Sequence, residues 1–254
     1  MDKRGQVTIF VIIAIIIVGV ILLLFAFGGL PTLLGGGQII PSDFLTTCIM
    51  SDLQKDVTLL SNNAGYENPE ASVMYKGENY TYLCYTTEYY KTCTIQQPFI
   101  KNNFEKELAR MLTPKAQQCA QSLVTAYQKA GYSVSSSANS NVSIVVGPEK
   151  ISVDFMVNLV VSKQGATQKI DKVSASLNSQ LYNLMFIASS IVDFEAVYGD
   201  SETTLYMQYY PDLRIDKIRR DDGSKIYTLT DVVTTDRFRF AVRSLAWPAG
   251  YGFG

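Results

Sequence analysis

An uninterrupted apolar run near the N-terminus limits this chain to few architectures. The run extends from Val7 to Phe27, reads VTIFVIIAIIIVGVILLLFAF and contains no charged residue. A helix of this length, rising ~1.5 Å per residue, crosses the ~30 Å hydrocarbon layer of a bilayer. A buried core helix would normally be shorter with a polar edge, and a cleaved secretory signal would have a shorter apolar region. The sequence therefore predicts a transmembrane helix over residues 6–28, with the lipid bilayer as a partner.

Basic residues flank only one side of this run. Lys3 and Arg4 precede it, and no lysine or arginine follows until Lys55. The positive-inside rule then places the N-terminus, residues 1–5, in the cytoplasm. We expect a single-pass protein of the cell membrane whose remaining residues are extracellular.

All four cysteines follow the apolar run, where an oxidising compartment would let them pair. Four cysteines allow three pairings. The short separation of Cys84 and Cys93 suggests a local staple, which leaves Cys48 to join Cys119 between two predicted helices. A metal site built from all four remains an alternative, although no CxxC spacing is present.

Two glycosylation sequons also lie after the run, at Asn79-Tyr-Thr and Asn141-Val-Ser. Both fall in predicted exposed turns, where a glycan could be attached. The sequence is thus compatible with a surface glycoprotein.

The segment after the run begins with a hinge and continues with helices. Glycines and prolines concentrate in 29–41 and break the helix. Apolar residues then repeat at helical spacing to Asn62, with Ser42 as a candidate N-cap. A Tyr- and Thr-rich stretch at 72–94 predicts a hairpin with its turn at 76–79. Two further helices are expected at 99–111 and 114–130, the second starting at Pro114. Together these form a helical and hairpin part over 42–131.

The rest of the chain, 132–254, is predicted to be β-rich. Apolar and polar residues alternate over 151–162, which is typical of a half-buried antiparallel strand, and a partner strand is expected over 169–177. Further strands are expected at 213–219, 225–229 and 237–243. The fold class is therefore α+β, with an N-terminal transmembrane helix, amphipathic helices and an antiparallel β-sheet ectodomain.

One helix in this β-rich part, at 179–198, is apolar on nearly every side. Such a helix is either deeply buried or part of an interface. Phe186 and Phe194 are the candidate interface residues. The aromatic and glycine-rich tail Trp247–Gly254 is expected to be either a frayed terminus or an arm that packs on a neighbouring subunit.

The composition excludes several classes of chemistry. The chain has no histidine, which removes His-dependent catalytic triads and His zinc sites. The 22 basic and 23 acidic residues create no field that would attract nucleic acid. An acidic cluster (Asp193, Glu195, Asp200, Glu202) could form a calcium site or a carboxylate pair, but its spacing matches no loop motif and favours a solvated helix end. We expect no enzyme, no cofactor and no metal.

The first residues resemble a known signal. The opening Lys3-Arg-Gly-Gln-Val-Thr-Ile-Phe10, followed by the apolar run, is similar to the class III signal of archaeal type IV pilin-like proteins. That resemblance implies that a prepilin peptidase cuts between Gly5 and Gln6 and that the apolar helix joins a filament core. The same opening, with the hinge and a cysteine-bearing helix at Cys48, also resembles single-pass surface proteins of small-genome symbiotic archaea.

These features favour a structural or adhesive cell-surface subunit, pilin-like and self-assembling as a homo-oligomer. The 16 tyrosines suit exposed contact surfaces. The alternative is a heterotypic accessory subunit or receptor of a cell-envelope complex, in which the same surfaces meet other envelope proteins. An enzyme with a histidine-free carboxylate site is a third, more distant alternative.

Overall fold

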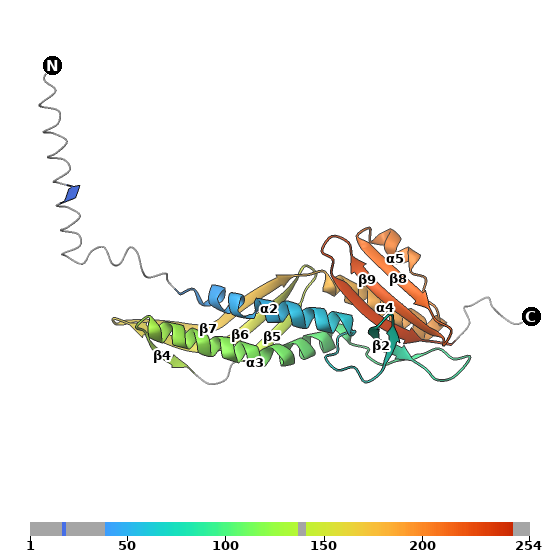
Figure 1. The fold of residues 1–254 in the computed structure, drawn as a ribbon, viewed down its shortest axis with the longest axis horizontal. Coiled ribbons are helices and arrows are strands. Elements are labelled where there is room, and N and C mark those ends of the chain that lie inside the picture. The colour runs from blue at the N-terminus through green and yellow to red at the C-terminus, as the bar shows by residue number, and fades with distance from the viewer. Residues whose placement is uncertain (1–16, 19–38, 137–140, 246–254) are drawn as a thin grey trace, which may run out of the picture. The chain divides into compact units, whose positions relative to one another are not determined.

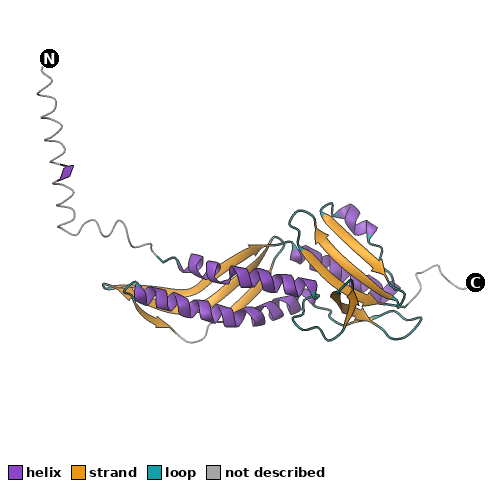
Figure 2. Cartoon of the chain, in the orientation of Figure 1, coloured by secondary structure: helices purple, strands orange, loops and turns teal. Residues whose placement is uncertain are grey.

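The computed structural model describes residues 17–18, 39–136 and 141–245 and has an α+β fold (Figures 1 and 2). The chain divides into two units, 1–40 and 41–254. Ile17 and Val18 are helical. The rest of the expected membrane span, residues 29–38 of the expected hinge and the tail at 247–254 lie outside the described residues, whereas Pro41, the last residue of the expected hinge, begins a helix. Among the helices that are described, none is both long and apolar enough to span a membrane.

The second unit combines long helices with two sheets. Its helices are α2 (Pro41–Asn62), α3 (Ile100–Lys129), α4 (Leu181–Tyr198) and α5 (Thr204–Tyr209). Its strands are β1 (Ser72–Tyr75), β2 (Glu78–Tyr85), β3 (Thr94–Ile95), β4 (Ser133–Ser136), β5 (Val142–Val146), β6 (Lys150–Lys163), β7 (Ala166–Asn178), β8 (Leu213–Arg219), β9 (Ser224–Asp231) and β10 (Arg237–Arg243).

One sheet has the strand order β1-β2-β10-β9-β8, with β3 also paired to β2. Its neighbours are antiparallel except β2 and β10, which run parallel. The sheet is therefore mixed rather than purely antiparallel as expected. Because β2 belongs to the 42–131 part and β10 to the 132–254 part, the two expected parts share this sheet.

The other sheet is built around the long β6–β7 hairpin. Its two-residue turn, Gln164 and Gly165, has positive φ at both positions, the conformation that matches the twist of a tight hairpin. β4 and β5 both pair with β6. Helices α2 and α3 lie side by side along this sheet (Figure 1) and contact each other and its strands. Alternate β6 residues are buried, as the sequence pattern predicts.

The first two long helices differ in part from expectation. α2 begins at Pro41, so Ser42 lies inside the helix instead of capping it. The two helices expected at 99–111 and 114–130 are one helix, α3, with Pro114 in its interior. Proline removes one backbone hydrogen bond there, but the buried stripe continues across it through Leu108, Leu112 and Ala116. Packing against α2 therefore outweighs the local cost.

Helix α4 packs against the mixed sheet through contacts with β2, β9 and β10. The sheet's core includes Phe238 and the stacked rings of Tyr227 and Phe240, whose centroids are 5.0 Å apart. Gly199 caps α4 in the left-handed conformation, with φ 79°, and its N–H donates to the carbonyl of Glu195. The short helix α5, which the sequence pattern did not predict, follows this turn.

Candidate functional site

Two disulfides bond all four cysteines in the pairing expected from the sequence. Cys48 of α2 joins Cys119 of α3, with 6.0 Å between their Cα atoms. Cys84 of β2 joins Cys93, just before β3, at 5.3 Å. The four-cysteine metal site is therefore wrong, because each sulfur is bonded to another sulfur.

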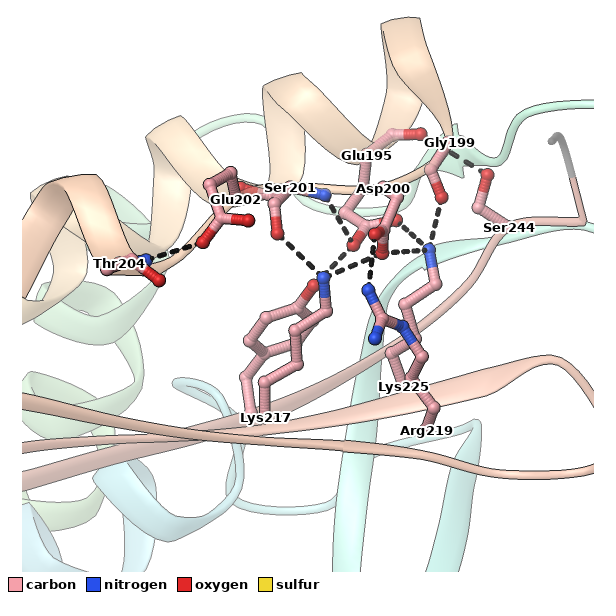
Figure 3. Close-up of polar contacts among 11 residues, drawn as sticks. Glu195, Gly199, Asp200, Ser201, Glu202, Thr204, Lys217, Arg219, Lys225 and Ser244 are labelled. Carbon is pink, nitrogen blue, oxygen red and sulfur yellow. Dashed lines mark hydrogen bonds and ion pairs between the residues drawn. The ribbon is translucent and has the colours of Figure 1, made fainter. Parts of the chain in front are cut away.

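A buried polar cluster connects the end of α4 to the mixed sheet (Figure 3). Its centre is Glu195, whose side chain is fully buried. The ammonium of Lys225, on β9, donates to the Glu195 carboxylate and to the Gly199 carbonyl. The Tyr227 hydroxyl donates to the other Glu195 oxygen, which also accepts from the Ser201 N–H at 3.2 Å. Glu195 thus has both an opposite charge and a full set of hydrogen-bond donors, as burial requires.

Asp200 forms the second half of this cluster, which we call the α4–β9 ionic cluster. Lys217 Nζ and Arg219 Nη2 of β8 each donate to its carboxylate at 2.6 Å, and Lys225 Nζ lies 3.3 Å from Oδ1. Burial alone would raise the pKa of Asp200, but these cations outweigh it and lower the pKa to about 2. Asp200 therefore stays ionised over the ordinary pH range.

The same surroundings affect two neighbouring groups. Burial lowers the pKa of Lys217, and the nearby Asp200 carboxylate opposes only part of that effect. Burial raises the pKa of Tyr227, and the negative charge of Glu195 raises it further. The phenol of Tyr227 therefore stays protonated and donates to Glu195.

This arrangement corrects the prediction of a solvated helix end. Glu195 is buried, whereas Asp193 and Glu202 are exposed, so the four acidic residues do not converge. Two carboxylates face three cations, which leaves no excess negative charge for calcium. Within the described residues, no group of acidic or cysteine side chains could hold a metal ion.

The cationic partners of this cluster were not predicted from the sequence, although their spacing was a signal. Lys217 pairs with Tyr227, and Arg219 with Lys225, in the β8–β9 register. Residues two apart in a strand lie on one face, so these four side chains share the face toward α4. An acidic residue at the end of an apolar helix is the partner that such a face would need.

The other predicted site residues lie at the surface of the molecule. Phe186 is 63% exposed and Phe194 46% exposed, both on the outer side of α4. α4 is therefore buried on one side only, through residues such as Leu184, Ile187 and Ile191. Both sequon asparagines are exposed; Asn79 lies in β2 rather than in a turn, and Asn141 directly precedes β5. The candidate processing site, Gly5 and Gln6, lies outside the described residues.

No protein-family model matches this chain, and no curated protein matches it either.

Proposed function

We propose that this chain is a membrane-anchored, extracellular structural or adhesive subunit of the cell surface that assembles with itself. The observation that carries the proposal is the pair of disulfides in the described residues. Disulfides persist in oxidising compartments and are rare in the cytosol. They lie on the side of the apolar run 7–27 opposite to Lys3 and Arg4, which is the side that the positive-inside rule assigns to the exterior.

The α4–β9 ionic cluster supports a structural role over catalysis. The alternative of an enzyme with a histidine-free carboxylate site would need a carboxylate free to accept a proton or bind substrate. Glu195 and Asp200 are instead occupied by Lys225, Lys217 and Arg219. Their arrangement holds α4 on the sheet, as a mechanical subunit requires.

The topology can be tested with one added thiol. Thr167 lies in the exposed β6–β7 hairpin, and all described native cysteines are bonded. We expect a membrane-impermeant maleimide to label Thr167→Cys on intact cells, while the unaltered chain stays unlabelled. Labelling only after the cells are opened would refute the extracellular assignment.

The resemblance to archaeal pilin-like proteins supports a finer proposal, which is that a prepilin peptidase cuts after Gly5. The mature chain would then begin at Gln6. N-terminal sequencing of the protein purified from its own membranes tests this, with Gly5→Val as the variant expected to retain the leader. A native chain that begins at Met1 would rule out processing but not anchorage.

A heterotypic subunit or receptor of an envelope complex is the competing proposal. It would use the same exposed apolar surface on α4 to meet a different polypeptide. Mass analysis of the native particle separates the two, because a self-assembling subunit gives multiples of one chain mass.

A further inference from the structure

The outer side of α4 and the neighbouring helix α5 carry several large exposed apolar side chains. In α4, Phe186, Phe194, Val197 and Tyr198 are all exposed, and the rings of Phe194 and Tyr198 are 4.8 Å apart. Spacings of three and four residues place side chains on one face of a helix. These residues therefore form one stripe along α4.

Helix α5 widens this stripe. The Ser190 hydroxyl, midway between Phe186 and Phe194, is 2.8 Å from the Tyr206 hydroxyl of α5. Figure 3 shows the end of α4 and the start of α5 on the same side of the strands that carry Lys217 and Lys225. Leu205 and Tyr209 lie four residues apart on α5 and are 55% and 81% exposed. We call the six residues Phe186, Phe194, Val197, Tyr198, Leu205 and Tyr209 the α4–α5 surface.

The chemistry of this surface is that of an interface core. On α4, Asp193 is the only charged residue that is exposed, and it lies on the same face as Val197, four residues before it. Interface cores are depleted in charge and enriched in Phe and Tyr. An ordinary solvated helix would instead have a polar outer face.

Its area is also sufficient for a specific contact. With roughly 150–250 Å² for each aromatic side chain, the exposed fractions of Phe186, Phe194, Tyr198 and Tyr209 amount to about 500 Å². Val197, Leu205 and a polar rim add to this. A stable interface buries roughly 600–1,000 Å² on each partner, so α4 and α5 together reach that range while α4 alone does not.

We propose that the α4–α5 surface binds the same surface of a second copy of this chain; this rests on the proposed function, which confines copies to one membrane. An isologous pair needs only one self-complementary patch. Other large apolar side chains exposed in the described residues lie on separate elements, such as Met74 on β1 and Val145 on β5, or in smaller groups, such as Tyr89 with Tyr90 and Tyr210 with Val233. They offer no second patch of this size for a head-to-tail contact.

In the proposed pair, Phe186 of each copy faces Phe194 of the other, which places the two-fold axis near Ser190. Phe186 and Phe194 each lie four residues from Ser190, so antiparallel packing of two α4 helices places Phe186 of one copy against Phe194 of the other. In an isologous contact this pairing occurs twice. The aromatic anchors then occupy the centre of the interface, where hot spots concentrate.

Intermolecular crosslinking tests this geometry in the full-length protein. All described cysteines are in disulfides, so an added thiol reacts alone. Two differently tagged copies carrying Phe186→Cys and Phe194→Cys, expressed together, should form a mixed disulfide dimer under mild oxidation. Two copies that both carry Met74→Cys should not. Absence of the mixed dimer, or crosslinks only between identical positions 186, would overturn the antiparallel pair.

Particle mass in mild detergent gives an independent measurement. The parent should have twice the chain mass or more, and the double variant Phe186→Glu with Phe194→Glu should fall by half. Met74→Glu, which adds a charge at a side chain that is 66% exposed elsewhere, should leave the mass unchanged. Unchanged thermal unfolding of the double variant shows that it is folded; loss of folding would show that these residues are core and would overturn the proposal.

Other occupants of the surface give different results. A monomeric parent that dimerises when residues 246–254 are removed would show that the tail covers the surface. A second polypeptide bound at these phenylalanines in place of a copy would show a heterotypic interface. Either result overturns the homotypic pair, whereas surface labelling of Thr167→Cys on intact cells reports on the proposed location whatever the oligomeric state.

Discussion

Replacing Asp200 with asparagine should lower the free energy of unfolding by about 2 kcal/mol. The pKa of Asp200 falls from the ordinary 3.8 to about 2, and one pKa unit corresponds to about 1.4 kcal/mol. The ionised form therefore contributes about 2 kcal/mol to the free energy of unfolding at neutral pH. Its side chain is only 20% exposed, so solvent screens this contribution little.

The sign of the pH dependence follows from the lowered pKa. Stabilisation by Asp200 is fully present above the unfolded-state value near 3.8 and is lost as the pH falls through about 2. Asp200→Asn lacks this contribution at every pH. The difference in stability between parent and variant should therefore be constant from pH 7 to about 5 and shrink steadily toward pH 2.

Thermal unfolding of the full chain in mild detergent, followed by circular dichroism, measures this difference. A loss of about 2 kcal/mol should lower Tm by roughly 4–8 °C in a unit of this size. Asp216→Asn makes the same chemical change on β8, where the carboxylate is 47% exposed and pairs with Arg214; exposed pairs of this kind contribute about 0–1 kcal/mol. Equal Tm values for the two variants, or a gap that persists unchanged to pH 2, would refute the reasoning.

Three further changes test other parts of the fold by the same melting assay. Replacing both cysteines of the α2–α3 disulfide, whose residues are 71 positions apart, should lower the free energy of unfolding by about 4 kcal/mol. Replacing those of the β2 disulfide, 9 positions apart, should lower it by about 2.5 kcal/mol. The reverse order would contradict the loop-entropy explanation. Lys225→Met should cost about 3–5 kcal/mol because it leaves Glu195 buried without its cation, and adding Glu195→Leu should restore part of that loss. Gly223→Ala should lower Tm more than Gly165→Ala, since both glycines have positive φ but only at Gly223 would an added Cβ collide with the Leu245 side chain. Equal Tm losses would show that the Leu245 side chain moves aside freely.

Short-range patterns in the sequence predicted the helices and strands that such patterns define. The alternation over 151–162 identified β6, and the spacing of apolar residues identified α2 and α4 to within two residues. The interruption at Pro114 was overestimated, because the buried stripe of α3 continues across it and packing outweighs a local cost of about 3 kcal/mol. The parallel pairing of β2 with β10 could not be predicted, since no local signal relates strands so distant in sequence.

The residues of the candidate site were also only partly predictable from the sequence. Exposure of Phe186 and Phe194 was one of two outcomes that the pattern allowed, and only the packing of α4 on the sheet decides which side is buried. Glu195 was read as solvated because sequence spacing does not show which strands face a helix end. The positions of Lys225 and Tyr227 become informative only when the β8–β9 register is known.

The parallel pair of β2 and β10 has a consequence for how the chain acquires its structure during synthesis. The ion pair between Glu78 and Arg239, which accompanies this pairing, joins residues 161 positions apart. A ribosome adds roughly 5–20 residues per second. On the order of ten seconds or more therefore pass between the synthesis of β2 and that of β10. Throughout that interval β2 has an unpaired edge that invites pairing with another nascent chain. A polypeptide that ends before β10 would therefore keep this edge of β2 unpaired.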